Sequence, residues 1–192
     1  MKLILLISIL VNLLIADTWT SGMKVEKNNE KILLDVITIY NEEPPKNGFK
    51  KTEFGEIAFI DKDYNFTVNK YTYGYGTKSV EKINVDINIS FSNTFEQNMC
   101  GPQHVAHIKL SINDQLIIDT NFNDCMRMLN KAEIDFKNEK FLFCEEPYND
   151  EYKGCVEFSF ATFYNSEKLQ NRLKGRGTIL EPAMSSYYGR LR

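Results

Sequence analysis

The chain has 192 residues, of which 43% are hydrophobic, and a formal net charge of −3. This length suits a single domain that can bury a real core, and the mild negative charge excludes a strongly basic domain, so we expect no nucleic-acid partner. Its 13 Phe and 10 Tyr against one Trp favour β-structure over a helical bundle.

The N-terminus has the features of a secretory signal peptide. Lys2 precedes an apolar run that ends at Ala16, and polar residues follow. This run is shorter than the roughly 20 apolar residues of a membrane-spanning helix, and no second run of that length follows. Cleavage after Thr18 is favoured, with cleavage after Ala16 as the alternative. We therefore predict a signal peptide over residues 1–18 and a secreted, extracellular protein that does not span a membrane.

The mature chain begins with an expected exposed lead from Trp19 to Glu30. A strand is predicted over Ile32 to Tyr40, where apolar residues occupy both parities. Two prolines and an Asn-Gly pair within residues 41–48 then indicate a loop and a turn. A longer strand is predicted over Tyr64 to Tyr75.

Two N-glycosylation acceptors lie on predicted strands. They are Asn65, in Asn-Phe-Thr, and Asn88, in Asn-Ile-Ser. In each strand the acceptor has the parity opposite to the apolar residues, which predicts that it lies on the solvent-exposed face. We therefore expect a glycoprotein in which glycans cover these faces, so that a partner would use strand edges, loops, the interior or the tail.

A tyrosine-rich stretch follows the first acceptor. In an extended chain Tyr71, Tyr73 and Tyr75 project on one side, and Gly74 and Gly76 allow the backbone to bend. Exposed tyrosines of this kind are candidate ligand-binding residues, because Tyr combines a flat apolar ring with a polar tip. The alternative is a strand end whose tyrosines cover the core.

The clearest alternation lies in the centre of the chain. Apolar residues of one parity run from Ile83 to Phe91, which predicts a strand with one buried face. Two further alternating segments, Ala106–Ile112 and Leu116–Phe122, flank a short polar connection and predict an antiparallel hairpin.

Four cysteines in a secreted chain predict two disulfides. Three pairings are possible. We favour Cys100 with Cys125, at the ends of the central hairpin region, and Cys144 with Cys155, around an acidic loop.

The last predicted strand runs from Cys155 to Tyr164, and a helix is predicted from Ser166 to Lys174, ending at Gly175. Strands at roughly ten-residue spacing favour an all-β fold, an antiparallel β-sandwich (or barrel) of about nine strands with two disulfides and a short C-terminal helix. The expected organisation is the secreted β-sandwich domain over residues 19–164, followed by a basic C-terminal helix and tail over residues 165–192. This tail carries a net charge of +4 and the rest of the chain −7.

Candidate catalytic and metal-binding groups are few. His104 and His107 have a spacing that places them on opposite faces of a strand, so shared metal coordination is not expected. The acidic residues of the expected disulfide loop fit solvated loop positions better than a glycosidase pair or a calcium loop. They are Glu145, Glu146, Asp150 and Glu151. We predict no catalytic residue, no metal and no cofactor.

The broad plan resembles that of secreted β families that hold lipids between sheets or inside a barrel, including lipocalins and the MD-2-related lipid-recognition proteins. The resemblance is one of class, since Trp19 precedes the first predicted strand without the Gly-x-Trp of a lipocalin. It implies a carrier of an apolar small molecule or lipid, a reading that the many Phe and Tyr residues also allow. Our leading expectation is a secreted non-enzymatic binding protein that recognises an extracellular protein or glycan, with the carrier second and a secreted hydrolase third.

Overall fold

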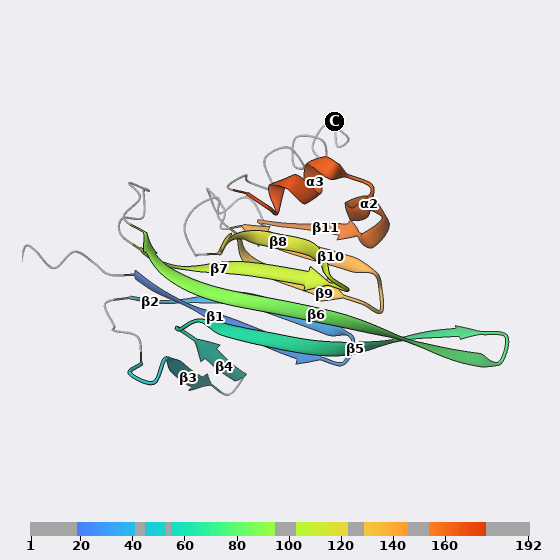
Figure 1. The fold of residues 1–192 in the computed structure, drawn as a ribbon, viewed down its shortest axis with the longest axis horizontal. Coiled ribbons are helices and arrows are strands. Elements are labelled where there is room, and N and C mark those ends of the chain that lie inside the picture. Colours follow the sequence, from blue (N-terminus) through green and yellow to red (C-terminus); the bar gives the residue numbers. More distant parts are fainter. Residues whose placement is uncertain are drawn as a thin grey trace, which may run out of the picture.

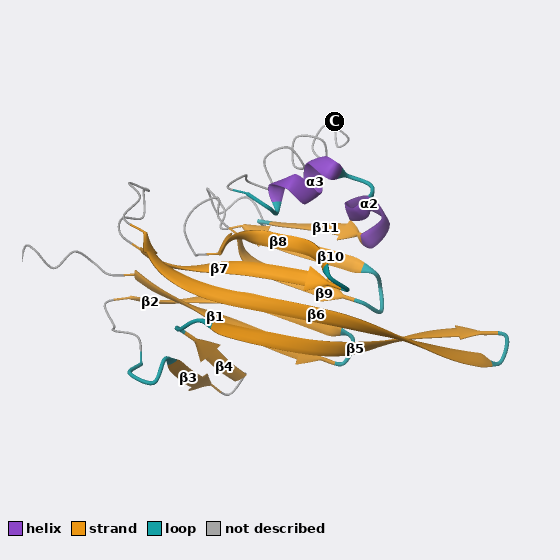
Figure 2. Cartoon of the chain, in the orientation of Figure 1, coloured by secondary structure: helices purple, strands orange, loops and turns teal. Residues whose placement is uncertain are grey.

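The computed structural model describes residues 19–40, 45–52, 55–94, 103–122, 129–145 and 154–175. These residues form an 11-stranded sheet and two short helices, as Figure 2 shows. The strands are β1 (Trp19–Asn28), β2 (Lys31–Tyr40), β3 (Phe49–Thr52), β4 (Gly55–Ala58), β5 (Lys62–Gly74), β6 (Thr77–Thr94), β7 (Gln103–Ile112), β8 (Gln115–Phe122), β9 (Leu129–Asp135), β10 (Lys140–Glu145) and β11 (Cys155–Ser159). The helices are α2 (Phe160–Tyr164) and α3 (Glu167–Arg172).

The strands form one curled, open sheet, a half-barrel (Figure 1). Its order is β3-β4-β1-β2-β9-β8-β7-β6-β5, and β10 and β11 extend from β9. The start of β1 also pairs in parallel with the start of β7, so the sheet curls back toward itself. The predicted all-β fold is confirmed, but the predicted sandwich is wrong, because strand pairing joins the strands into a single open sheet rather than two packed sheets.

One apolar core fills the concave side of the sheet. The alternation predicted over Ile83 to Phe91 is confirmed in β6, where Ile83, Val85, Ile87 and Ile89 are buried. The central hairpin is also confirmed as β7 and β8. Between them Asn113 and Asp114 both adopt positive φ, as a two-residue hairpin turn requires.

The expected exposed lead from Trp19 to Glu30 is wrong, because most of it is strand β1. This strand pairs with β2 along its whole length, and Met23 is fully buried. Asn29 adopts positive φ in the connecting turn, which Asn tolerates. The segment has little apolar alternation of its own, so its strand character depends on its neighbours in the sheet.

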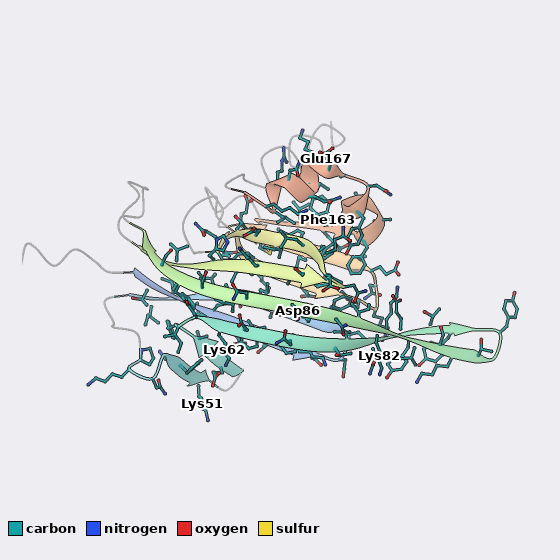
Figure 3. All side chains as sticks on the ribbon, in the orientation of Figure 1. Lys51, Lys62, Lys82, Asp86, Phe163 and Glu167 are labelled. Atoms are coloured by element: carbon teal, nitrogen blue, oxygen red, sulfur yellow. A yellow bond between two sulfur atoms is a disulfide. The ribbon has the colours of Figure 1, made fainter. Side chains whose placement is uncertain are left out.

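The chain leaves the sheet earlier than the sequence predicted. Strand β11 ends at Ser159, whose side chain accepts a hydrogen bond from the backbone N–H of Thr162 and caps α2. The aromatic residues of α2 pack on β10, with the ring centroids of Phe163 and Phe141 4.8 Å apart. Figure 3 labels Phe163 between the helices and the strands. No helix in the described ranges is long and apolar enough to cross a membrane.

The C-terminal helix is confirmed as α3. Ser166 caps it, because its side-chain hydroxyl oxygen accepts a hydrogen bond from the backbone N–H of Leu169. One predicted disulfide is also confirmed, since Cys144 and Cys155 face each other in the β10–β11 pair and are bonded. Cys100 and Cys125 lie outside the described residues, as does the predicted signal peptide.

Candidate binding site on the β5–β6 hairpin

The longest hairpin of the described structure contains all three candidate tyrosines. Strands β5 and β6 pair residue by residue from Lys62↔Ile89 to Gly74↔Thr77. The connecting turn consists of Tyr75 and Gly76, with φ of 38° and 79°. Positive φ at both central positions is the type I′ pattern whose twist matches that of paired strands.

The end of this hairpin projects beyond the rest of the sheet (Figure 1). Pairing between β6 and β7 begins at Val85↔Ile112, so the part of β6 that precedes Val85 pairs only with β5. Figure 3 labels Lys82 near the place where the hairpin leaves the body, and Asp86 further along β6 over the body.

The face of the hairpin turned away from the core, here called the outer face, carries an exposed apolar patch. Its members are Tyr71, Tyr73, Tyr75 and Val80, with exposed fractions of 38, 74, 111 and 51%. We call these four residues the tyrosine patch. Tyr71 lies opposite Val80 and Tyr73 opposite Lys78, and the Lys78 Nζ atom is 4.0 Å from the centre of the Tyr71 ring. The tyrosines therefore lie on the surface and do not cover the core.

Polar contacts from the end of β1 and from two turns hold the base of the hairpin. The Lys27 Nζ atom donates to the Thr67 carbonyl oxygen at 2.7 Å, and Lys70 forms an ion pair with Glu139. On the opposite edge, the backbone N–H of Asn84 donates to the Asn113 side chain at 2.9 Å. These contacts fix the direction in which the hairpin leaves the body.

A groove of about 640 Å³ runs beside the β5 edge at this base. One wall is the outer face of β5, and the other consists of the end of β1, the β1–β2 turn and the β9–β10 turn. Its lining residues are Lys27, Asn29, Glu30, Thr67, Asn69, Tyr71, Tyr73 and Lys137. No sequence pattern indicated the wall opposite the tyrosines, because its residues come from the end of β1, the β1–β2 turn and the β9–β10 turn, which are far apart in the chain.

The two glycosylation acceptors share the outer face with the tyrosine patch. Asn65 and Asn88 are both exposed, as their parity predicted. The Nδ2 atom of Asn88 donates to Asp63 at 2.5 Å across the strand pair. Glycan attachment at either residue stays a prediction.

The histidine and acidic residues that the sequence singled out lie apart from the hairpin tip. His107 lies on β7, with Nδ1 2.8 Å from Asn121 Oδ1 and Nε2 2.7 Å from Asp119 Oδ1. The backbone of His104 belongs to the same strand. Within the described part of the chain, no group of three or more potential metal-binding side chains occurs.

The predicted acidic loop is described only at its start. Glu145 is buried at the end of β10, so the prediction of a solvated position was wrong for this residue. The reason is that Glu145 still belongs to the sheet, and its backbone N–H donates to the Gly154 carbonyl oxygen. Glu146, Asp150 and Glu151 lie outside the described residues.

A separate charged cluster joins β2, β9 and the β9–β10 turn. Lys31 contacts Glu133 at 2.7 Å and Asp135 at 2.9 Å, and its bond to Glu133, followed by that to Asp135, raises the pKa of its ammonium. Burial raises the pKa of Asp135, but hydrogen bonds from Asn138 and the Lys31 ammonium outweigh burial and lower this pKa to about 2. Because the charges satisfy one another, the cluster stabilises the turn and offers no free group for chemistry.

In comparisons with known proteins, no protein-family model, no curated protein and no solved structure matches this chain.

Proposed function

We propose that this protein is a secreted, non-enzymatic binding protein that recognises an extracellular protein through the outer face of the β5–β6 hairpin. One observation carries the proposal. Of the five large apolar side chains that are exposed in the described residues, four form the tyrosine patch. Exposed apolar side chains gathered on one projecting element are typical of interaction sites, and tyrosine is enriched among the residues that dominate binding energy.

The backbone at the hairpin tip supports the same conclusion. Tyr75 adopts φ of 38° and its side chain is fully exposed. A left-handed conformation costs an L-residue about 1–2 kcal/mol, and no burial offsets that cost here. Backbone strain of this kind clusters at functional sites, which supports a contact between the Tyr75 ring and a partner.

Two further observations favour surface binding over the carrier and the hydrolase. The largest buried aromatic side chains, among them Phe122, Phe141 and Phe163, are at most 1% exposed and pack within the core, so they act as core filling. The ring nitrogens of His107 are hydrogen bonded to the side-chain oxygens of Asn121 and Asp119, so neither of them is paired with a hydroxyl or thiol nucleophile as in a catalytic triad.

The proposal can be tested with an array of purified extracellular protein domains from the source organism, probed with the mature, glycosylated protein. The test variant carries Tyr71→Ser, Tyr73→Ser and Tyr75→Ser. The control is Ile60→Ser, which removes the one large exposed apolar side chain of the described residues that lies off the hairpin. We expect the triple variant to lose at least about tenfold in affinity, because hot-spot tyrosines each contribute more than 1 kcal/mol, and the control to bind normally.

A glycan array probed in parallel decides the class of partner. Tyrosine-dependent binding to glycans alone would replace the protein partner with a glycan. Equal binding by the triple variant and the native chain would refute the site. Loss of the folded circular-dichroism spectrum in the triple variant would mean that the tyrosines hold the fold, and it would also refute the proposal.

A further inference from the structure

We infer that the partner contributes an extended, acidic segment, which adds as a new strand to the free edge of β5 between Asn69 and Tyr73. This inference rests on the proposed function, since it specifies how the hairpin would hold its partner. Strand addition is a general mode of peptide recognition, in which backbone hydrogen bonds supply affinity and alternate side chains supply specificity.

The hairpin register determines which backbone groups point to the free edge. In an antiparallel pair, opposite residues alternate between those that exchange hydrogen bonds and those whose N–H and C=O groups point outward. Because a two-residue turn closes on the bonded pair Gly74↔Thr77, the outward positions on β5 are Thr67, Asn69, Tyr71 and Tyr73.

Two observed contacts agree with this assignment. The Thr67 carbonyl oxygen accepts a hydrogen bond from Lys27 across the free edge of β5. Its partner in the register, Asn84, exchanges bonds with Asn113 across the other edge. At the next three outward positions, Asn69, Tyr71 and Tyr73, no described residue forms a hydrogen bond with the backbone N–H and C=O groups that point to the free edge. They provide a template about 17 Å long, from five residues at about 3.3 Å each.

The two edges of the hairpin differ in their protection. On β6 the outward positions include Lys78 and Lys82, and lysines on an edge strand discourage further pairing. On β5 the corresponding positions are Asn69, Tyr71 and Tyr73, none of which is charged. Lys70, which lies between them, faces the other side and pairs with Glu139. The β5 edge is therefore the one open to an added strand.

The charges around the groove favour an acidic segment. Two lysines, Lys27 and Lys137, line it against a single carboxylate, Glu30. A second copy of this chain would bring a second Lys27 and Lys137 to the same groove, which like-charge repulsion disfavours. The acidic side chains of such a segment would meet Lys27 and Lys137, and its apolar side chains would cover the tyrosine rings.

The test separates the backbone edge from the tyrosine side chains. Asn69→Pro removes one outward N–H but keeps the tyrosine patch and the β5–β6 bonds, because proline is tolerated at the free side of an edge strand. Asn69→Ala is the matched control, which removes the side chain and keeps the N–H. Amide hydrogen exchange of the hairpin establishes that both variants remain folded.

The probe is a fluorescein-labelled nonapeptide in which valine and aspartate alternate, measured by fluorescence anisotropy. Two further peptides carry N-methyl groups, one on every valine amide and the other on every aspartate amide. With the valines on the tyrosine face, only one set of peptide amides faces β5. In antiparallel addition these are the valine amides, and in parallel addition they are the aspartate amides. We expect Asn69→Pro to weaken the parent peptide at least tenfold relative to Asn69→Ala, and one N-methylated peptide alone to lose binding.

Other results would overturn the inference. If the parent peptide does not bind, or binds the proline variant and both N-methylated peptides equally well, no acidic strand is added at this edge. A dimer that Asn69→Pro dissociates would identify a second copy as the occupant instead. The proposed function fails separately, when the triple tyrosine variant keeps its binding on the domain array. An array partner that needs the tyrosines but tolerates Asn69→Pro would leave the proposed function standing and refute strand addition.

Discussion

Replacing the strained residue at the hairpin tip should strengthen the hairpin and weaken recognition. We expect Tyr75→Asn to relieve the backbone, because Asn tolerates the left-handed region in which Tyr75 lies, with φ of 38°. The side chain is fully exposed, so its loss removes no core packing. The gain should be about 1 kcal/mol, at the lower end of the left-handed penalty for an L-residue.

This gain should be local to the hairpin. The segment near the tip pairs only with itself, so it can open without unfolding the sheet. The suitable readout is therefore amide hydrogen exchange at Thr77, whose N–H closes the turn. A gain of about 1 kcal/mol corresponds to roughly fivefold slower exchange. Amides of the β7–β8 hairpin, whose turn already contains Asn113 and Asp114, serve as the internal reference.

Tyr75→Gly is a second comparison. Glycine also accepts positive φ, but it loses more conformational entropy on folding, so its exchange rate should fall between those of the native chain and Tyr75→Asn. Faster or unchanged exchange at Thr77 in Tyr75→Asn would refute the strain argument and would mean that the tyrosine ring itself holds the turn.

Two further predictions concern the body of the protein. Gly22→Ala should lower the free energy of unfolding, measured in urea, by about 1–3 kcal/mol through overpacking, because its Cβ would lie 2.5 Å from Ile57 and 2.6 Å from Phe59. The control is Gly74→Ala, whose Cβ would have no atom within 4 Å and should leave the free energy of unfolding unchanged. Equal effects of the two substitutions would contradict the packing argument. The Asp135 carboxylate, with its pKa lowered to about 2, should stabilise the fold fully above pH 5 and lose that contribution as the pH falls toward 2, by at most about 2 kcal/mol. Asp135→Asn should flatten this part of the stability profile, and parallel profiles for both chains would refute the assignment.

Local pattern was sufficient wherever a residue's environment depends on its near neighbours in sequence. Alternation in β6 identified its buried face and the exposed acceptor Asn88, because side chains along a strand point to opposite faces with a period of two. The Cys144–Cys155 bond was predictable because the two cysteines end adjacent antiparallel strands. The C-terminal helix was predictable from the capping residue Ser166.

Tertiary structure decided the features that depend on contacts between distant segments. β1 is a strand because β2 and β4 pair with it, and β11 gives way to α2 because the rings of α2 pack on Phe141. The prediction of a sandwich was wrong for the same reason, since the pairing of β1 with β7 brings distant parts of one sheet together and makes that sheet curl. The sequence by itself determined that Tyr71, Tyr73 and Tyr75 share one side of an extended chain. The exposure of this side on a projecting hairpin, beside a groove completed by Lys27 and Lys137, depends on how the sheet curls. Lys27 lies at the end of β1 and Lys137 in the β9–β10 turn, and no local pattern connects these two segments.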